Sequence, residues 1–265
     1  MTGAPLLTIR DLSVIWPGTE RPAVAGVSLD LRQGERLALI GESGSGKSTL
    51  ARAIAGLLPP RTRLRGGLHW AGDTPRLGRD IGYVFQDPGG SLDPLLSIGA
   101  QLVETLRAHL PLDRAAARDR AQALLTQVRL PDPAAALAAY PHQFSGGQRQ
   151  RIAIALAIAA DPKLLIADEA TSALDMLVQA EITALLRELS ETRGMTLLFI
   201  THDIALAGGL ADRIAVMRDA HLVEAGAARQ VIDAPTEAYT RQLLAAHMDL
   251  NGPRLVGPAP EAVSA

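Results

Sequence analysis

The sequence predicts an α/β fold, with a mainly parallel sheet and a helical subdomain inserted near residues 95–160. Strand-like and helix-like segments alternate along the 265 residues, a pattern typical of parallel sheets. An apolar run at residues 37–40 precedes a glycine-rich loop and then helix-forming residues. From residue 98 to 130 the pattern becomes helical and rich in Ala, Arg, Leu and Gln. We therefore expect a single domain over residues 1–250 and a flexible tail, rich in Pro, Gly and Ala, over 251–265.

The remaining elements follow in chain order from hydrophobic periodicity and from Pro and Gly breakers. Between residues 59 and 78, Pro, Gly and Arg predict loops around one short strand. Other strands are expected at residues 6–15, 24–31, 37–40, 81–85, 163–167 and 196–200, with a late hairpin at 214–217 and 222–224. Helices are expected at residues 49–58, within 98–130, from 148 to a stop at 161–162, and over 178–189, where apolar residues share one face.

Composition excludes several classes of function. The chain has 26 basic and 28 acidic residues, a net charge of −2, and no basic stripe, so a nucleic-acid partner is not expected. It has no cysteine, which excludes disulfides, iron–sulfur clusters and thiolate zinc sites and fits a reducing cytoplasm. No segment approaches the ~18 uncharged apolar residues that span a membrane, and no secretion signal is visible. Any membrane role should therefore come through a partner.

The sequence GESGSGKS at residues 41–48 matches the phosphate-binding loop pattern G-x-x-x-x-G-K-[ST]. Its glycines let backbone N–H groups turn toward phosphate oxygens, and the following helix N-terminus adds positive charge. Lys47 should reach the β- and γ-phosphates, and the Ser48 hydroxyl should ligate Mg²⁺. The alternative is a glycine-rich turn that binds nothing, which the Lys-Ser pair and the flanking elements disfavour. The residues of this stretch predicted to bind ATP are Gly41, Glu42, Ser43, Gly44, Ser45, Gly46, Lys47, Ser48 and Thr49.

A pair of carboxylates, Asp168 and Glu169, ends the apolar strand expected at 163–167. Side chains at the carboxyl ends of strands face the ligand crevice of open α/β sheets. Asp168 would hold Mg²⁺, directly or through water, and Glu169 could polarise the attacking water. Alone, the pair could equally be a solvated acidic strand end, but a phosphate-binding loop needs such a metal site.

A second Ser-Gly-Gly sequence lies in FSGGQ, residues 144–148, directly before the helix expected from Gln148. It predicts a second helix N-terminus that could bind an anion. The alternative is a plain helix cap, since Ser and Gly both favour caps.

With these motifs, the chain resembles the ATP-binding subunits of ABC transporters over about residues 6–245. The usual signature of that family begins with Leu, where this chain has Phe144. The resemblance implies that Trp16 stacks on adenine, Gln86 senses Mg²⁺ and the permease, and His202 contacts the γ-phosphate. Taken alone, these residues could be a half-exposed aromatic, a loop amide and a strand-end histidine. The sequence SALD at residues 172–175, ending in Asp175, matches the loop that crosses the dimer interface.

The resemblance also implies a mechanism and partners. The expected fold is a RecA-like P-loop NTPase core with an N-terminal antiparallel β subdomain. Two cassettes, identical or different, close head-to-tail around two ATPs, and membrane permeases and, indirectly, a solute-binding protein complete the transporter. The chain would then lie peripherally on the cytoplasmic face of the plasma (inner) membrane. The implied roles are catalysis by Glu169, His202, Gln86 and Lys47; Mg²⁺ binding by Ser48, Gln86 and Asp168; and ATP binding from the opposite chain by Ser145, Gly146, Gly147 and Gln148.

Several short sequence segments resemble the peptide and nickel importer branch of this family most closely. The matching segments are FQDP, SLDP, YPHQ and the stretch from Ala234 to Leu244. Ala170 replaces a usual proline, and Glu237-Ala238 replaces a usual His-Pro. The short C-terminal region favours a metal or metal-chelate cargo slightly over peptide. Alternatives are a soluble ABC-type ATPase acting on nucleic acid or ribosomes, an exporter subunit, and a mainly structural cassette partner.

Overall fold

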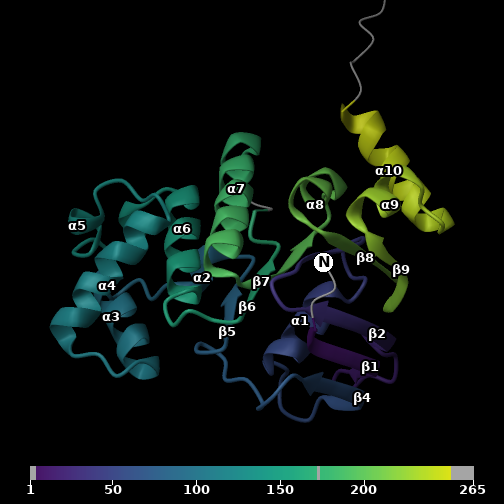
Figure 1. Ribbon diagram of the computed structural model, residues 1–265, viewed down its shortest axis with the longest axis horizontal. Coiled ribbons are helices and arrows are strands. Elements are labelled where there is room, and N and C mark those ends of the chain that lie inside the picture. The colour runs from purple at the N-terminus through teal and green to yellow at the C-terminus, as the bar shows by residue number, and fades with distance from the viewer. Residues whose placement is uncertain (1–3, 172–173, 252–265) are drawn as a thin grey trace, which may run out of the picture.

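A computed structural model describes residues 4–171 and 174–251, which form two sheets and a set of helices (Figure 1). The tail expected at 251–265 lies outside the described residues apart from Asn251, and so do Ser172 and Ala173. Within the described chain the predicted fold class is confirmed: a parallel core sheet, an antiparallel N-terminal sheet and a group of helices between strands of the core.

The core sheet has the strand order β5-β6-β7-β3-β8-β9. Neighbouring strands from β5 to β8 are parallel, and β9 alone pairs antiparallel, with β8. Residues of β6 and β7 are buried throughout, as expected of strands covered on both faces. Its strands are β3 (Arg36–Ile40), β5 (Ile81–Val84), β6 (Leu164–Asp168), β7 (Thr196–Thr201), β8 (Arg213–Arg218) and β9 (His221–Ala227).

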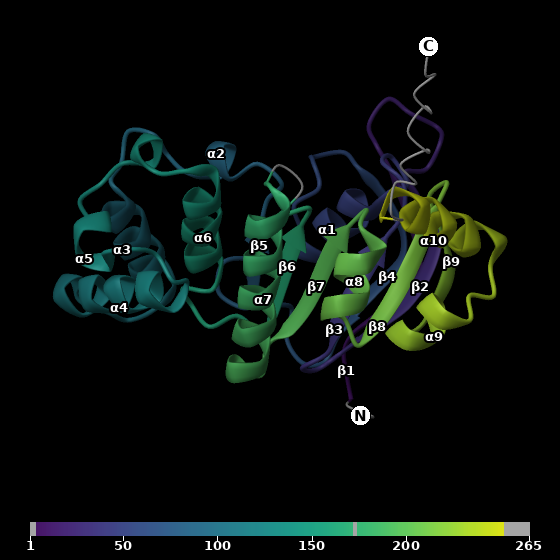
Figure 2. The same cartoon turned by 90° about the horizontal axis from the view of Figure 1, so that it is seen from above.

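The N-terminal sheet is antiparallel, with the order β2-β1-β4. It faces the core sheet across helix α1, and apolar residues of α1 such as Leu50 and Ile54 join both sheets in one buried cluster. Figure 2 shows α1 between the two sheets. The strands are β1 (Pro5–Ile15), β2 (Val24–Arg32) and β4 (Arg63–Trp70), the last being the strand expected between residues 59 and 78.

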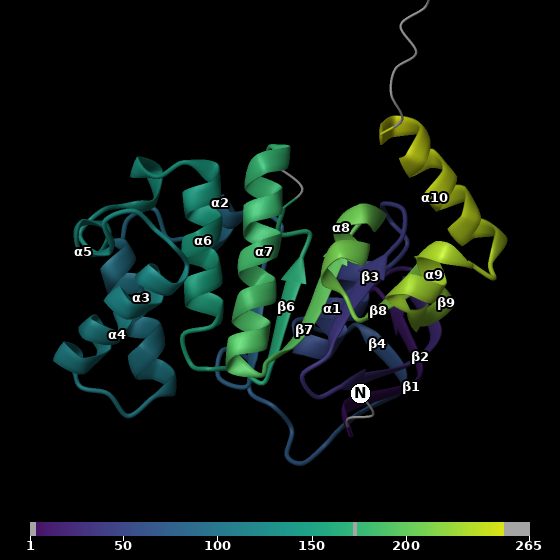
Figure 3. The same ribbon diagram turned by 45° about the horizontal axis from the view of Figure 1, so that its top comes forward.

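The helices divide into a group beyond one edge of the core sheet and a group that covers its faces. Helices α3 to α6 lie together on the far side of α7 from α1 in all three views (Figure 3). Helices α8, α9 and α10 pack near β3 and β8. The helices are α1 (Lys47–Ala55), α2 (Pro88–Ser91), α3 (Ile98–His109), α4 (Arg114–Gln127), α5 (Pro133–Ala136), the 3-10 helix η1 (Pro141–Gln143), α6 (Gly146–Ala157), α7 (Met176–Arg193), α8 (Ile204–Leu210), α9 (Ala228–Asp233) and α10 (Ala238–Asn251).

Helix boundaries differ from expectation where capping decides them. Helix α6 begins at Gly146 rather than Gln148, because Ser145 and Gln148 form a reciprocal capping box. It ends at Ala157, before the expected stop at 161–162. Helix α1 begins at Lys47 and ends at Ala55, where Gly56 adopts the left-handed conformation that terminates helices. The sequence pattern located these helices and missed their ends by a few residues.

Candidate nucleotide-binding site

The predicted phosphate-binding loop, Asp168, Glu169, Gln86 and His202 lie at the carboxyl edge of four neighbouring parallel strands. The phosphate-binding loop follows β3, and Asp168 ends β6. Gln86 follows β5, and His202 follows β7. Because β5, β6, β7 and β3 are adjacent and parallel, their carboxyl ends share one edge, where open α/β sheets bind ligands.

The phosphate-binding loop is held in shape by its own backbone and by Lys47. The buried Lys47 ammonium donates to the carbonyl oxygens of Gly41 and Glu42, at 2.8 Å each. An ammonium has three donors, so one more can serve a phosphate oxygen. Burial lowers the pKa of Lys47, while nearby carboxylates oppose that shift. Gly46 has φ 102°, and a Cβ there would lie 2.3 Å from the Ala23 carbonyl oxygen, so this turn requires glycine.

Asp168 is 3 % exposed, and both of its oxygens have donors. The Ser48 hydroxyl donates to Oδ1 at 2.8 Å, and the Tyr83 hydroxyl donates to Oδ2 at 2.7 Å. Burial, followed by the charge and hydrogen bond of Asp168, raises the pKa of Tyr83. The tyrosine therefore stays protonated and remains a donor. The structure thus brings the predicted partners Ser48 and Asp168 together and adds a buried tyrosine that the sequence analysis did not include.

Glu169, the residue after Asp168, is hydrogen-bonded to Gln86 at the same edge of the sheet. The Gln86 amide donates to Glu169 Oε2 at 2.9 Å. Glu169 has φ 47°, a left-handed conformation that is uncommon for residues other than glycine and that concentrates at functional sites. Its backbone N–H donates to the Ile200 carbonyl oxygen on β7 at 3.0 Å, and this bond fixes the turn that projects the carboxylate.

A cavity of about 680 Å³ opens beside these groups. It is lined by Gly41, Glu42, Ser43, Gln86, Glu169, His202 and Leu243. His202 is exposed and precedes Asp203, which caps α8 by accepting from the N–H groups of Ala205 and Leu206. Trp16 is half-buried after β1 and is not among the described residues that line this cavity.

The Ser-Gly-Gly sequence lies elsewhere, at the N-terminus of α6. Ser145 is exposed there and accepts from the Gln148 N–H. A Cβ on Gly147 would lie 2.7 Å from Val178 Cγ1, so glycine lets this turn approach α7 closely. Asp175, which matches the interface loop, caps α7 through the Val178 N–H at 3.0 Å. In every view α6 is separated from α1 by α7 (Figure 3), so the two predicted anion-binding elements do not meet within the chain.

Two site residues from the C-terminal helix were not predicted. The Tyr239 hydroxyl accepts from the Glu42 backbone N–H at 3.1 Å, and Leu243 lines the cavity. The Arg218 guanidinium lies 4.8 Å from the centre of the Tyr239 ring, and burial raises the pKa of Tyr239. Tyr239 stands in the segment that carried the importer-branch resemblance, which was the available signal, but nothing local places it against a loop almost 200 positions earlier.

Comparison with known proteins identifies the class. The ABC transporter family profile matches residues 24–172. The chain is 48 % identical over 256 residues to a peptidoglycan transport ATP-binding protein of Agrobacterium fabrum, covering 91 % of this chain and 47 % of that protein. It is 42 % identical over 254 residues to an oligopeptide transport ATP-binding protein of Bacillus subtilis, covering 91 % and 71 %. The chain thus spans about half the length of the first relative and over two thirds of the second.

A solved structure agrees with the sequence relatives. The fold matches a dimeric ATP-binding cassette, bound to ADP and Pi after hydrolysis, with TM-score 0.72 and 30 % identity, over 84 % of this chain and 99 % of that chain. The chain belongs to the ABC transporter family and is an ATP-binding cassette ATPase. None of the helices in the described ranges, 4–171 and 174–251, combines the length and the apolar composition of a membrane span.

Proposed function

We propose that this cassette supplies the energy for a binding-protein-dependent importer of peptides. The observation that carries the catalytic part is the meeting of Lys47, Ser48, Asp168 and Glu169 at one sheet edge. The assignment of peptide as the cargo is supported by relatives at 41–48 % identity, which are named as peptide, dipeptide, oligopeptide or peptidoglycan transport proteins. Peptide therefore takes precedence over the metal cargo that the short C-terminal region favoured, and nickel or a metal chelate remains the second candidate.

The residues present fit a Mg²⁺ site formed jointly with nucleotide. The Ser48 hydroxyl and the Asp168 carboxylate lie 2.8 Å apart, and Gln86 approaches from β5. All three offer the oxygen ligands that Mg²⁺ prefers, and Mg²⁺ usually takes few protein ligands and completes its shell with phosphates and waters. When bound, the ion would neutralise charge on the phosphate oxygens.

The protein residues divide the catalytic work. Glu169 is the proposed general base, because Gln86 and its own backbone turn hold its carboxylate at the cavity wall. Lys47 stabilises negative charge on the β- and γ-phosphates, and His202, which lines the same cavity, contacts the γ-phosphate. Loop N–H groups from Gly41 to Thr49 bind phosphate oxygens, and Trp16 stacks on adenine.

A second cassette completes each site. Residues Ser145 to Gln148 form a helix N-terminus in which Ser145 is exposed and which does not meet the phosphate-binding loop of the same chain. One helix end carries only about half a charge. We propose that this turn closes on the ATP bound to the other chain, as the dimeric arrangement of the solved relative suggests. Asp175 and its loop would lie at that interface.

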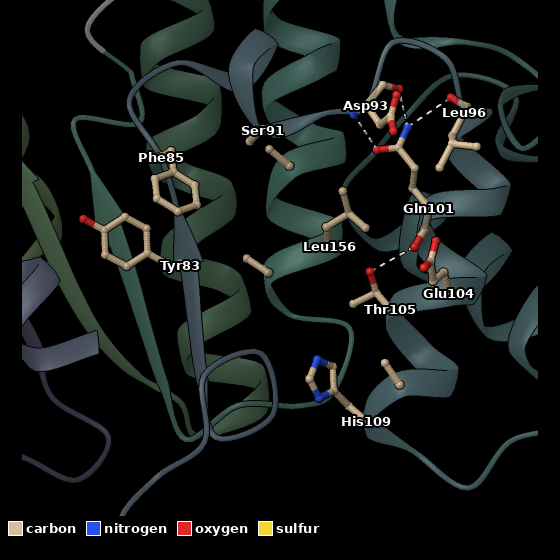
Figure 4. A pocket seen from close by; sticks show the side chains of 13 residues that line it. Tyr83, Phe85, Ser91, Asp93, Leu96, Gln101, Glu104, Thr105, His109 and Leu156 are labelled. Carbon is tan, nitrogen blue, oxygen red and sulfur yellow. Dashed lines mark hydrogen bonds between the residues drawn. The ribbon is translucent and has the colours of Figure 1, made fainter. Parts of the chain in front are cut away.

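The helical group that starts near residue 95 and ends near residue 160 would receive the permease. Between it and β5 lies a groove of about 520 Å³, with Phe85, Leu96 and Leu156 among its walls (Figure 4). We propose that the cassette, a single domain over residues 1–250, docks there to permeases at the cytoplasmic face of the membrane. A soluble role on nucleic acid or ribosomes has no support among the relatives, and the intact catalytic set speaks against a purely structural role.

Purification of the tagged chain from its native membranes in mild detergent, followed by mass spectrometry, tests this assignment. Two permeases, a cassette and a solute-binding protein are the expected companions, and the ligand of that binding protein would identify the cargo. The Lys47→Ala chain is the matched control, since it should recover the same companions without ATP turnover. Recovery of ribosomal or DNA-repair proteins without any permease would overturn the importer assignment.

A further inference from the structure

We propose that Tyr83 is a positioning residue that links the groove between β5 and α3 to the carboxylate of Asp168. Its hydroxyl fixes the carboxylate that would hold Mg²⁺, and its ring forms part of the groove wall. The link to a docked partner rests on the proposed function, whereas the positioning of Asp168 stands on the geometry of this chain alone.

The hydroxyl of Tyr83 makes one defined hydrogen bond, to the carboxylate of Asp168. Tyr83 is 9 % exposed, and its hydroxyl donates to Asp168 Oδ2 at 2.7 Å. The other oxygen of Asp168 accepts from Ser48. The carboxylate is therefore oriented by two donors from different elements, one on α1 and one on β5. Hydrogen-bonded partners of this kind set the orientation of a metal-binding carboxylate.

The ring end of Tyr83 lies at the groove. Figure 4 shows the ring beside Phe85, with the hydroxyl directed away from the groove. The two ring centres are 4.5 Å apart, with planes inclined by 40°, an arrangement typical of attractive aromatic pairs. Phe85 is 40 % exposed and lines the same groove as Tyr83. A side chain that enters the groove would meet Phe85 and, through it, the Tyr83 ring.

Strand pairing and burial restrict the movement of the Tyr83 side chain. Tyr83 pairs in register with Ile166 of β6, two residues before Asp168, and it belongs to the buried cluster between the two sheets. A shift of the ring would therefore be felt at its hydroxyl rather than absorbed by a loose side chain, because close-packed interiors transmit displacement. Gln86 lies three residues after Tyr83, just beyond the end of β5, so this short segment contacts both carboxylates, Asp168 through Tyr83 and Glu169 through Gln86.

Tyr83→Phe tests the positioning role, because it removes the hydroxyl and keeps the ring. Mn²⁺ serves as the probe, titrated against the ADP-loaded isolated chain and followed by electron paramagnetic resonance. We expect Mn²⁺ affinity to fall roughly tenfold, the scale of lost partners of metal ligands, while ADP affinity in EDTA stays unchanged. Tyr140→Phe, on an exposed tyrosine, is the control and should leave both values unchanged. Unchanged Mn²⁺ affinity in a folded Tyr83→Phe chain would overturn the proposal.

Phe85→Ala tests the link to the groove and leaves the buried ring in place. We expect a several-fold loss of Mn²⁺ affinity in the wild-type background and no further loss in the Tyr83→Phe background, since coupled residues give non-additive effects. Equal losses in both backgrounds, or none in the first, would contradict the link. Both experiments use the isolated chain, so they can fail while the membrane purification still returns permeases, and the reverse also holds.

Discussion

The two anion-binding helix ends of this chain differ in how much of the protein supports them. The phosphate-binding loop and the N-terminus of α1 contact Tyr239 of α10 and Asp168 of β6, and Tyr83 of β5 in turn supports Asp168. The N-terminus of α6 has a capping box and close packing on α7, and its Ser145 is exposed. The first element thus has side chains from other parts of the chain around it, whereas the second presents an exposed Ser145, which fits the proposal that a second chain completes it.

Glu169→Gln should produce the largest effect on the supported half-site. Removal of a general base lowers the rate by about 10²- to 10⁴-fold, while ATP binding persists because the amide keeps the shape of the carboxylate. Steady-state ATP hydrolysis measures the loss, and size-exclusion chromatography with ATP should show an accumulated dimer. Glu20→Gln, on an exposed loop, is the control. Wild-type-like turnover in Glu169→Gln would refute the base assignment.

Ser145→Arg should distinguish the function of the α6 N-terminus from that of the α1 N-terminus. We expect hydrolysis to fall by roughly a hundredfold, as when one preorganised anion donor is lost, while ATP binding to the single chain is retained. Lys47→Ala should instead lose ATP binding as well. Fluorescent ATP titration and hydrolysis assays distinguish the two patterns, and Ser145→Thr, which keeps a hydroxyl cap, is the control. Loss of ATP binding by the single Ser145→Arg chain would place the signature within its own site.

Tyr239→Phe should have a smaller effect, on the loop rather than on the chemistry. One neutral hydrogen bond contributes about 0.5–1.5 kcal/mol, so the KM for ATP should rise roughly two- to tenfold with kcat nearly unchanged. Initial rates over a range of ATP concentrations measure the split, with Tyr140→Phe as the matched control. A fall in kcat at constant KM would contradict a role in shaping the phosphate-binding loop.

Asp212→Asn should have the smallest effect, at the opposite edge of the sheet. Burial works to raise the pKa of Asp212, but hydrogen bonds and charge from Arg36 lower it below the ordinary 3.8. The stabilisation is therefore present above pH 3.8 and is lost as the pH falls through the lower folded value. Because the side chain is about half exposed, the effect should be at most about 1 kcal/mol.

Urea unfolding from pH 7 down to pH 3 checks this sign. The difference in unfolding free energy between wild type and Asp212→Asn should shrink below pH 4. Asp73→Asn, on an exposed loop, should show no such trend. A difference that grows on acidification would show that the Arg36 contact does not hold the carboxylate ionised.

Residue type and spacing were sufficient to predict the parts of the site that lie within short segments. Lys47, Ser48, Asp168 and Glu169 follow apolar strands, so their place at one sheet edge could be inferred before any strand order was known. The contact of Gln86 with Glu169 required the adjacency of β5 and β6, which only the assembled sheet provides.

The remaining site residues depend on contacts that no local pattern records. Tyr83 looks like an ordinary apolar strand residue, and its bond to Asp168 joins positions 85 residues apart. Tyr239 meets Glu42 across 197 positions. The left-handed backbone conformation of Glu169 could not be predicted from the sequence either. Residues other than glycine rarely adopt it, and the neighbouring residues give no signal for it.

The central claim is that the signature turn of one chain closes on the phosphate-binding loop of another. The chain has no native cysteine, so a Ser43→Cys chain can be mixed with a Ser145→Cys chain and treated with a short bismaleimide, with ATP and EDTA present to prevent hydrolysis. We predict a two-chain product that requires both variants and ATP. Two results would contradict the account. One is a chain with both cysteines that crosslinks only within itself, and the other is a two-chain product that forms equally well without ATP.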